Sequence, residues 1–354
     1  MQQAIDQLAA AIREAAAQKK PLCVRGGGTK DFYGGAPRGS RLDTTAYRGI
    51  VSHEPTELVI TARAGTPLAE IESALLEKGQ MLAFEPPHFG AGATLGGCIA
   101  TGLSGPRRAY AGSARDFVLG VRMLDGKGGD LKFGGQVMKN VAGYDVSRLV
   151  TGALGTLGVL LEVSLKVLPR PASETTLNFG CGEAEAIALM NQWAARPLPV
   201  TATAFRNEEL GVRLSGASVA VEAAIAKLGG TKVDPRQAVQ FWTGVREQSD
   251  PFFSGEQPLW RLSVKPTTPP LGLPGQQLIE WGGALRWLKS GADPGTIRDA
   301  ATRAGGHATL FRGGDKSAGV FQPLAPALMK LHRDLKRAMD PAGILNPGRL
   351  YPDL

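Results

Sequence analysis

The chain of 354 residues has few of the side chains from which metal sites and disulfide frameworks are built. Its three cysteines, Cys23, Cys98 and Cys181, stand far apart and form no CxxC pair. This pattern argues against a disulfide framework, a zinc site and an iron–sulfur site. Its four histidines lack HxxxH and HExxH spacing, so we expect no metal site. The scarcity of cysteine favours a reducing, cytoplasmic compartment.

Long hydrophobic runs and targeting signals are also missing. The first helix that we expect, Gln2–Gln18, has neither the positively charged start nor the apolar segment of a signal peptide. The uncharged run Phe89–Pro106 reaches 18 residues, a length at which a membrane helix has to be considered. Six of these residues are glycine and only four are large and apolar, so we interpret the run as a loop.

Clustered positive charge is missing as well. The formal net charge is +8, but lysines and arginines are scattered, and aromatic residues make up only 6% of the chain. No nucleic-acid-binding motif accompanies the charge, so we predict no nucleic-acid partner. We interpret the charge as a basic surface that suits an anionic ligand or a protein partner.

Glycine, in contrast, is abundant. The chain has 47 glycines, about 13% of its residues against about 7% in average proteins. Seventeen of them fall between Gly90 and Gly158, and neither a collagen period nor a linker repeat is present. Because glycine weakens helices and strands, this concentration indicates tight turns or a close approach of the backbone to a ligand.

Hydrophobic periodicity divides the first half of the chain into strands and helices, with a boundary at Pro169–Pro171 where the glycine density falls. Turn signals mark the ends of two elements: Gly79 follows the helix at 67–78, and Asp125-Gly126 predicts a hairpin after the strand at 117–124. The elements expected here are strands at 21–25, 58–62, 117–124, 131–133 and 158–168, and helices at 67–78 and 144–150.

The second half repeats a strand–helix–strand rhythm, which is typical of an antiparallel sheet with its helices on one face. A last helix at 325–339 follows from the spacing of Leu328, Leu331, Leu335 and Met339, and a short coil ends the chain. The other elements expected are strands at 175–179, 200–205, 211–214, 259–265, 278–281, 285–288 and 308–311, and helices at 183–194 and 217–228.

Three glycine-rich clusters carry the chemical signal. The first, Arg25–Lys30, directly follows a strand, so its successive backbone N–H groups can form a nest for an anion with no Cβ in the way. The second spans Gly92–Gly105, and the third comprises Lys139–Asp145 and Gly152–Val159. Taken alone, the first cluster is also compatible with a flexible turn.

Two other phosphate-binding motifs do not fit. Gly90-Ala91-Gly92 followed by Gly96 is similar to the NADP form of the dinucleotide fingerprint. However, Pro86-Pro87-His88 precedes it in place of a strand, and we expect Gly96, Gly97 and Gly102 to interrupt any helix. A Rossmann site is therefore not expected. No GxxxxGK[ST] motif is present, which excludes a P-loop NTPase.

In this order and spacing, the three clusters resemble the FAD-binding domain of the vanillyl-alcohol oxidase/para-cresol methylhydroxylase type. The matching features are a strand–RGGGT turn, an ATxGGxxAxxxxG loop, a DG hairpin, a GYD helix, a GxxGTLG strand entry and a DPxxxLNPG tail at Asp340–Gly348. The match covers residues 20–171 and 326–354. Within the family, the short length and the Phe84–Phe89 approach to the second loop are similar to the smaller, FAD-binding subunits of bacterial glycolate oxidases.

The resemblance implies an α+β fold in three parts. Residues 1–171 would form a two-subdomain FAD-binding domain of the para-cresol methylhydroxylase type, and residues 172–325 a ferredoxin-like α+β cap on the substrate side. Residues 326–354 would form a C-terminal helix and tail that return to the FAD-binding domain. The function implied is oxidation of glycolate, a small 2-hydroxy acid, to glyoxylate, with electrons passing through FAD to partner subunits.

The resemblance also implies which residues hold FAD. Gly26–Thr29 would hold the diphosphate through backbone N–H groups, Arg25 would brace the turn, and Asn346 would bring the tail against the flavin side. Gly155 and its neighbours would line the adenosine end. The complete set is Arg25, Gly26, Gly27, Gly28, Thr29, Gly92, Thr94, Leu95, Gly96, Gly97, Thr101, Gly102, Ser104, Gly155, Thr156, Gly158, Val159 and Asn346.

The sequence departs from the family pattern at two places. Thr29 stands where covalently flavinylated relatives carry histidine, so we expect non-covalent FAD; a link to Cys98 is the less favoured alternative. The HxGDGN motif and Glu-His pair of the catalytic 2-hydroxy-acid dehydrogenases are missing, so we name no catalytic residue and no metal. The candidates for holding a substrate in the second half are Arg261, Lys265, Arg286, His307 and Arg312.

The partners implied are a larger FAD-containing catalytic subunit and an iron–sulfur subunit of a glycolate oxidase complex. The complex would be cytoplasmic, or peripheral at the inner face of the cytoplasmic membrane. Two alternatives stay open at this point: a non-catalytic electron-relay or scaffold flavoprotein, and a stand-alone FAD-dependent reductase of the same fold.

Overall fold

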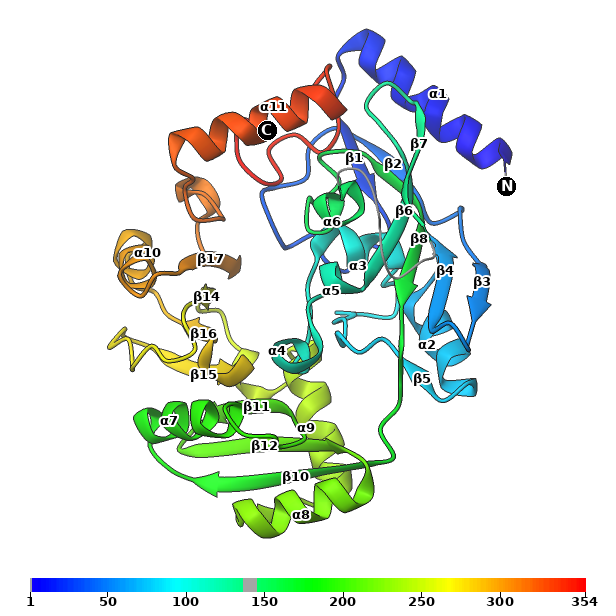
Figure 1. Ribbon diagram of the computed structural model, residues 1–354. Coiled ribbons are helices and arrows are strands. Elements are labelled where there is room, and N and C mark those ends of the chain that lie inside the picture. Colours follow the sequence, from blue (N-terminus) through cyan, green and yellow to red (C-terminus); the bar gives the residue numbers. More distant parts are fainter. Residues whose placement is uncertain (1, 136–144) are drawn as a thin grey trace.

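The structure is a computed structural model that describes residues 2–135 and 145–354. Most of the third cluster's first half, Lys139–Tyr144, and the start of the helix expected at 144 lie outside the described residues. The elements form two lobes (Figure 1). The first lobe holds the elements up to residue 169 and both termini, and the second lobe holds those between residues 173 and 318.

The first lobe is built on an antiparallel five-stranded sheet with the order β3-β4-β8-β6-β7. Its central strand, β8, is nearly all buried because almost every residue of its Val-Leu-Leu-Glu-Val-Ser-Leu-Lys sequence is apolar or small. The Asp125-Gly126 turn joins β6 to β7, as expected. The strand bounds are β3 Ile50–Glu54, β4 Val59–Arg63, β6 Val118–Leu124, β7 Asp130–Gly134 and β8 Val159–Lys166.

Two apolar cores flank this sheet. One core packs Leu68 and Ile71 of α2 (Leu68–Glu77) and Leu95 of α3 (Leu95–Thr101) against β4, β6 and β8. The other core packs α1 (Gln2–Gln18) and the parallel pair β1 (Leu22–Arg25) and β2 (Ser40–Asp43) against Val159 and Leu161. Smaller elements are β5 Gln80–Met81, α4 Arg108–Ala111, α5 Ala114–Phe117, α6 Val146–Val150 and β9 Leu168–Pro169.

The second lobe is an antiparallel eight-stranded sheet with the order β13-β10-β12-β11-β15-β16-β14-β17. Its strands are β10 Ser173–Gly180, β11 Val200–Arg206, β12 Glu209–Gly216, β13 Thr231–Lys232, β14 Leu259–Ser263, β15 Gln276–Glu280, β16 Leu285–Lys289 and β17 His307–Arg312. Its helices are α7 Glu183–Ala194, α8 Ser218–Leu228, α9 Pro235–Glu247 and α10 Pro294–Arg303, with short 3-10 turns at Pro251–Phe253, Trp281–Gly283 and Lys316–Ala318.

This sheet consists of two ferredoxin-like units placed edge to edge. The first unit runs β10-α7-β11-β12-α8-β13, and its strands lie in the order fourth, first, third, second. The second unit, β14-β15-β16-α10-β17, has the same order but a loop in place of its first helix. The units join where β11 pairs with β15. The α+β class and the ferredoxin-like cap expected from the sequence are thus confirmed.

The expectation that the helices lie on one face is wrong for α9. Helices α7 and α8 pack on one face of the first unit, whereas Trp242 of α9 packs against Ala202 and Ala204, on the opposite face. The indole N–H of Trp242 donates to Thr176 Oγ1 at 2.9 Å, which anchors α9 to β10.

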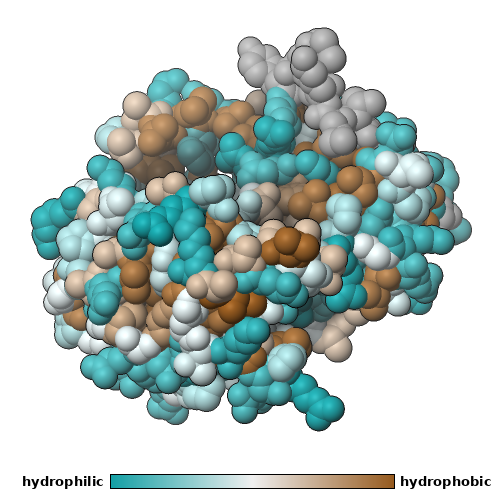
Figure 2. All heavy atoms as spheres, turned by 60° about the horizontal axis from the view of Figure 1, so that its bottom comes forward, coloured by the Kyte–Doolittle hydropathy of each residue, from teal (hydrophilic) through white to brown (hydrophobic). Residues whose placement is uncertain are grey.

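Over the lower part of the view in Figure 2, hydrophilic and hydrophobic residues are interspersed on the surface.

The last segment of the chain returns to the first lobe, as expected. Helix α11 (Pro326–Met339) is followed by a tail in which Leu345 pairs with Leu22 of β1. The Leu22 N–H donates to the Ile344 carbonyl at 2.7 Å, and the Asn346 N–H donates to the Leu22 carbonyl at 2.9 Å. Within residues 2–135 and 145–354, no helix is both long enough and apolar enough to cross a membrane.

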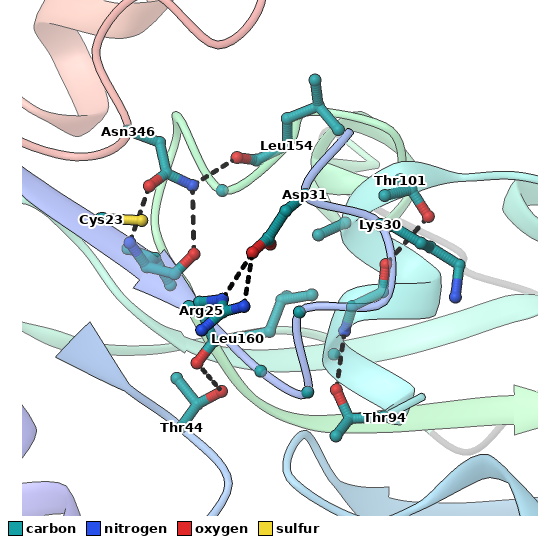
Figure 3. A pocket seen from close by; sticks show the side chains of 18 of the residues that line it. Cys23, Arg25, Lys30, Asp31, Thr44, Thr94, Thr101, Leu154, Leu160 and Asn346 are labelled. Carbon is teal, nitrogen blue, oxygen red and sulfur yellow. Dashed lines mark hydrogen bonds and ion pairs between the residues drawn. The ribbon is translucent and has the colours of Figure 1, made fainter. Parts of the chain in front are cut away.

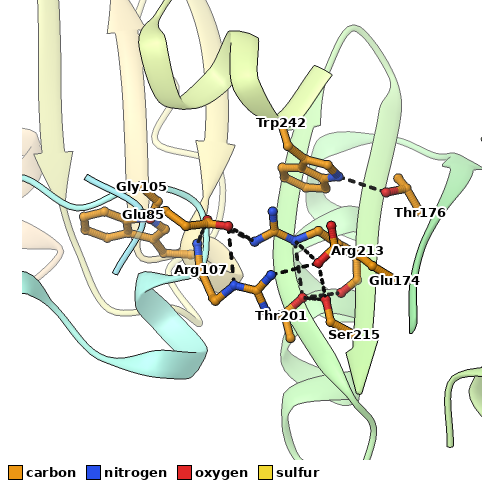
Figure 4. Close-up of polar contacts among 10 residues, drawn as sticks. Glu85, Gly105, Arg107, Glu174, Thr176, Thr201, Arg213, Ser215 and Trp242 are labelled. Atoms are coloured by element: carbon orange, nitrogen blue, oxygen red, sulfur yellow. Dashed lines mark hydrogen bonds and ion pairs between the residues drawn. The ribbon is translucent and has the colours of Figure 1, made fainter. Parts of the chain in front are cut away.

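Buried charges join the two lobes (Figure 4). Glu85 of the first lobe accepts hydrogen bonds from Arg107 N–H at 2.9 Å and from the guanidinium of Arg213 on β12 at 3.0 Å. Arg107 also reaches Glu174 on β10, at 2.8 Å. The indole N–H of Trp281 donates to the Gly105 carbonyl at 3.1 Å. These contacts hold the second lobe against the loops that precede and follow α3.

Candidate functional site

A cavity in the first lobe brings the three glycine clusters together (Figure 3). Twelve of the eighteen residues expected to hold FAD line it: Arg25, Gly26, Gly27, Gly28, Thr29, Thr94, Gly96, Gly97, Thr101, Gly155, Gly158 and Asn346. The other lining residues are Cys23, Val24, Lys30, Asp31, Pro37, Thr44, Ala64, Ala100, Leu154, Leu160 and Arg349.

The loop that follows β1 can be built only with glycine. A Cβ on Gly27 would lie 1.6 Å from the Gly92 carbonyl oxygen, so the first and second clusters touch backbone to backbone. Gly28 has φ +75°, which side-chain-bearing residues rarely adopt, and a Cβ there would collide with the Arg25 guanidinium. The loop therefore presents bare backbone to the cavity, as a diphosphate ligand requires.

An ion pair between Arg25 and Asp31 spans the same loop. Arg25 Nε donates to Asp31 Oδ2 at 2.7 Å, and this hydrogen bond raises the pKa of the guanidinium. The Thr44 hydroxyl donates to the Arg25 carbonyl at 3.4 Å (Figure 3). Arg25 thus spans the glycine turn, which is the position that the sequence predicted for it.

The second cluster contains a helix, and our interpretation of it as an uninterrupted loop is wrong. Helix α3 runs through Gly96 and Gly97, and Thr94 caps it by accepting from the Gly97 N–H at 3.3 Å. Gly96 is needed for close packing, because a Cβ there would lie 2.8 Å from the Ala64 Cβ. The burial of Leu95 and Ile99 in the core offsets the roughly 1 kcal/mol that each glycine costs a helix.

Six of the expected cofactor residues lie outside the cavity lining, each for a local reason. Thr156 is buried and donates to the Ala153 carbonyl, and Leu95 and Val159 belong to the two apolar cores. Gly102 ends α3 in a left-handed conformation, and Gly92 supports Gly27 from behind. Ser104 accepts from the Ala114 N–H and faces a separate chamber between the lobes. A direct contact of these six residues with FAD stays a prediction.

Two cations of the cavity, Lys30 and Arg349, are not among the residues expected to hold FAD. Lys30 is 7% exposed, and its ammonium donates to the His88 carbonyl at 3.1 Å. Arg349 is also 7% exposed and donates to the Tyr33 carbonyl at 2.6 Å. Burial lowers the pKa of both groups. Lys30 directly follows the RGGGT motif and Arg349 directly follows the LNPG motif. Their positions in the sequence therefore indicate that both lie near the cavity.

The electrostatics of the cavity favour an anion. Three cationic side chains line it, those of Arg25, Lys30 and Arg349, against one carboxylate, Asp31, which is already paired with Arg25. A diphosphate carries the negative charge that this excess of cations would balance. The glycine cradle and the cations thus fit the same part of a dinucleotide cofactor.

Comparison with known proteins decides the family. The family described as FAD binding domain matches residues 3–134, and the family of FAD linked oxidases, C-terminal domain, matches residues 313–350. The chain is 50% identical over 343 residues to glycolate oxidase subunit GlcE of Escherichia coli (strain K12), covering 97% of this chain and 96% of that protein. The chain belongs to the GlcE family of glycolate oxidase subunits. The resemblance read from the three glycine clusters is therefore confirmed.

More distant relatives match smaller parts of their own length. Glycolate oxidase subunit GlcD of Bacillus subtilis is 29% identical over 174 residues, 49% of this chain and 37% of that protein. D-lactate dehydrogenase of Archaeoglobus fulgidus is 30% identical over 217 residues, 60% of this chain and 48% of that protein. A solved structure of alkyldihydroxyacetonephosphate synthase shares the fold, with a TM-score of 0.68 at 16% identity, covering 97% of this chain and 74% of that one.

Cys98 does not face the cavity of this GlcE-family chain. It lies on α3 in the apolar core, is 1% exposed, and burial raises the pKa of its thiol to about 12. A thiol is a nucleophile only as the thiolate, which this position suppresses. The geometry therefore agrees with the preference for a small buried residue over a covalent flavin link at Cys98.

The substrate candidates of the second lobe lie in different environments. Arg286 is fully buried and donates to the carbonyls of Gly283 and Thr268, so it supports a loop. Lys265 and His307 are exposed, and the pKa of His307 is lowered by desolvation and by Arg261. Arg261 faces the chamber that Ser104 also lines, and Arg312 faces an open groove.

Asn346 ties the tail to the cavity, and we expect its loss to weaken both the fold and the site. Its Oδ1 accepts from the Val24 N–H at 2.7 Å, and its Nδ2 donates to the Leu154 carbonyl at 2.6 Å (Figure 3). Asn346→Ala leaves two buried backbone groups unpaired, which we expect to cost about 2–4 kcal/mol of unfolding free energy in urea titrations. Asn346→Asp keeps the acceptor for Val24 but sets a buried carboxylate oxygen against the Leu154 carbonyl, so it should be destabilising as well. Equal stability of the Ala variant and the wild type would contradict this role.

Proposed function

We propose that this chain is the FAD-binding subunit of a glycolate oxidase complex that oxidises glycolate to glyoxylate. The observation that carries the proposal is the glycine cradle with its excess of cations. It occurs in a chain that is 50% identical to GlcE of Escherichia coli over 97% of its length. A bound FAD would supply the redox chemistry, as acceptor of a hydride equivalent from the α-carbon of the acid. The protein binds and orients the cofactor.

The residues of the cavity divide this work among them. The Gly26–Gly28 backbone holds the diphosphate, with Lys30 and Arg349 supplying positive charge from buried positions. Gly155, Gly158 and Leu160 line the end of the cavity that lies against β8. FAD is held non-covalently, because Thr29 replaces the histidine of covalent relatives and its hydroxyl donates to the His88 carbonyl at 2.7 Å.

The partners in this proposal are a larger FAD-containing catalytic subunit and an iron–sulfur subunit. The relative named as a subunit supports membership of a multi-subunit assembly. The complex would work in the cytoplasm, in solution or at the inner face of the cytoplasmic membrane.

Anaerobic mixing with glycolate tests the proposal. The assembled complex is expected to lose the visible absorbance of its flavin within one turnover, whereas NADPH should leave it oxidised. Bleaching of the isolated, FAD-loaded chain by glycolate would place substrate oxidation in this subunit. Reduction of the isolated chain by NADPH but not by glycolate in any assembly would favour a stand-alone reductase and contradict the proposal.

A further inference from the structure

An open groove between the lobes carries a cation without a carboxylate partner. The groove has a volume of about 590 Å³ and is lined by Thr29, Phe32, Phe89, Gly90, Glu247 and Arg312. Thr29 also lines the glycine cradle, so the groove and the proposed FAD site meet at this residue. In the part of the chain that the structure describes, the Arg312 guanidinium makes no ion pair.

Aromatic rings, not acids, hold Arg312 in place. Its guanidinium carbon lies 4.5 Å from the ring centre of Phe32, 5.6 Å from that of Phe89 and 6.0 Å from that of Phe311. Burial lowers the pKa of the guanidinium. Contact with ring faces orients a guanidinium without using its N–H donors, so these remain available for a planar ligand with two oxygens.

The second lobe also sets the position of Phe89. Glu247 at the end of α9 accepts from the His88 N–H at 3.0 Å and the Phe89 N–H at 2.9 Å, and Arg246 Nε donates to it at 2.8 Å. Phe89 is thereby held at φ +53°, a conformation that costs free energy and persists only where surrounding contacts impose it. The ion pair of Glu247 is with Arg246 and not with Arg312, although both Glu247 and Arg312 line the groove.

Size separates Arg312 from Arg261, another arginine of the second lobe for which the described residues supply no ion pair. Arg261 faces a chamber of about 20 Å³, enough for roughly one water molecule. Among the described residues, the buried Oε1 atoms of Gln248 and Glu280, which both line that chamber, have no hydrogen-bond partner. An organic acid needs more room than this chamber has, and the groove at Arg312 is large enough for it.

We propose that Arg312 binds the carboxylate of a small 2-hydroxy acid in this groove, so that this subunit holds substrate itself. The inference rests on the proposed function, because it places the acid beside the end of the FAD site marked by Thr29. The two oxygens of a carboxylate match the fork of N–H donors on a guanidinium. The carboxylate would also balance the positive charge of Arg312, because the aromatic rings around Arg312 carry no charge.

The test measures glycolate binding to the purified, FAD-loaded chain by anaerobic equilibrium dialysis. We compare the wild type with Arg312→Met, which keeps length and packing, with Arg312→Lys, and with Arg261→Met as the matched control. FAD content per chain is determined for each. Losing a charge-assisted hydrogen bond should weaken glycolate binding by about tenfold to a hundredfold in Arg312→Met, and less in Arg312→Lys.

The controls make the outcome decisive. Arg261→Met should bind glycolate within about twofold of the wild type, all variants should retain FAD, and ethylene glycol, which lacks the carboxylate, should not compete. Wild-type affinity in Arg312→Met overturns the inference, as does an FAD-loaded wild type that binds no glycolate. A wild-type chain that takes up no FAD contradicts the proposed function itself, and the inference then falls with it.

Discussion

Replacing Gly27 by alanine should reduce FAD affinity at least a hundredfold. The new Cβ would lie 1.6 Å from the Gly92 carbonyl oxygen, a backbone atom that cannot rotate away. The first and second clusters would have to separate, and the N–H groups that face the diphosphate would lose their common orientation. Fluorescence titration of the apoprotein with FAD measures the effect directly.

A second glycine provides the matched control for Gly27. A Cβ on Gly180, at the end of β10, meets nothing within 4 Å, and φ there is not in the left-handed region. Gly180→Ala should bind FAD like the wild type. Far-ultraviolet circular dichroism of both variants separates loss of the site from loss of the fold. Normal FAD binding by a folded Gly27→Ala variant would contradict the role of the glycine loop in holding the diphosphate.

Replacing Glu85 by glutamine should destabilise the junction between the lobes by about 3–5 kcal/mol. The change keeps the shape but leaves Arg107 and Arg213, which are both buried, with one carboxylate fewer (Figure 4). Denaturant titration followed by tryptophan fluorescence is the measurement, since Trp242 and Trp281 lie near this network. Asp334→Asn, in an exposed ion-pair cluster on α11, should cost less than about 1 kcal/mol.

The same carboxylate predicts a pH dependence of stability. Burial acts to raise the pKa of Glu85, but Arg213 and Arg107 outweigh it and lower the pKa below the ordinary value of 4.5. A carboxylate with a lowered pKa stabilises the fold above its unfolded-state pKa and loses that contribution as the pH falls through its folded-state pKa. The wild type should therefore lose stability below pH 4.5, and Glu85→Gln should lack this component. Parallel acid profiles would contradict the role of Glu85.

Local sequence signals were sufficient for much of the fold. The apolar run of β8, the Asp125-Gly126 hairpin and the helices at α1 and α7 follow from residues close to one another in the chain. Two helices that we did not predict, α9 and α10, carried an equally local signal. Asp234-Pro235 and Asp293-Pro294 each place a capping carboxylate before a proline at the first helical position.

Other features depend on contacts that no local pattern contains. Helix α3 needs glycine at position 96 because Ala64, from a distant segment, leaves no room for a side chain there. The Glu85 network joins residues separated by up to 128 positions, and the unpaired state of Arg312 is visible only once its neighbours are known. The sequence therefore indicated the glycine clusters that line one cavity, whereas the groove between the lobes required the structure.

One measurement tests the central claim most directly: the flavin content of the purified chain. We expect about one equivalent of FAD per chain, bound with a yellow colour and released intact when the protein is denatured, because the cradle binds it without a covalent bond. A folded chain that is colourless and gains no flavin absorbance or fluorescence quenching on incubation with FAD would contradict the account.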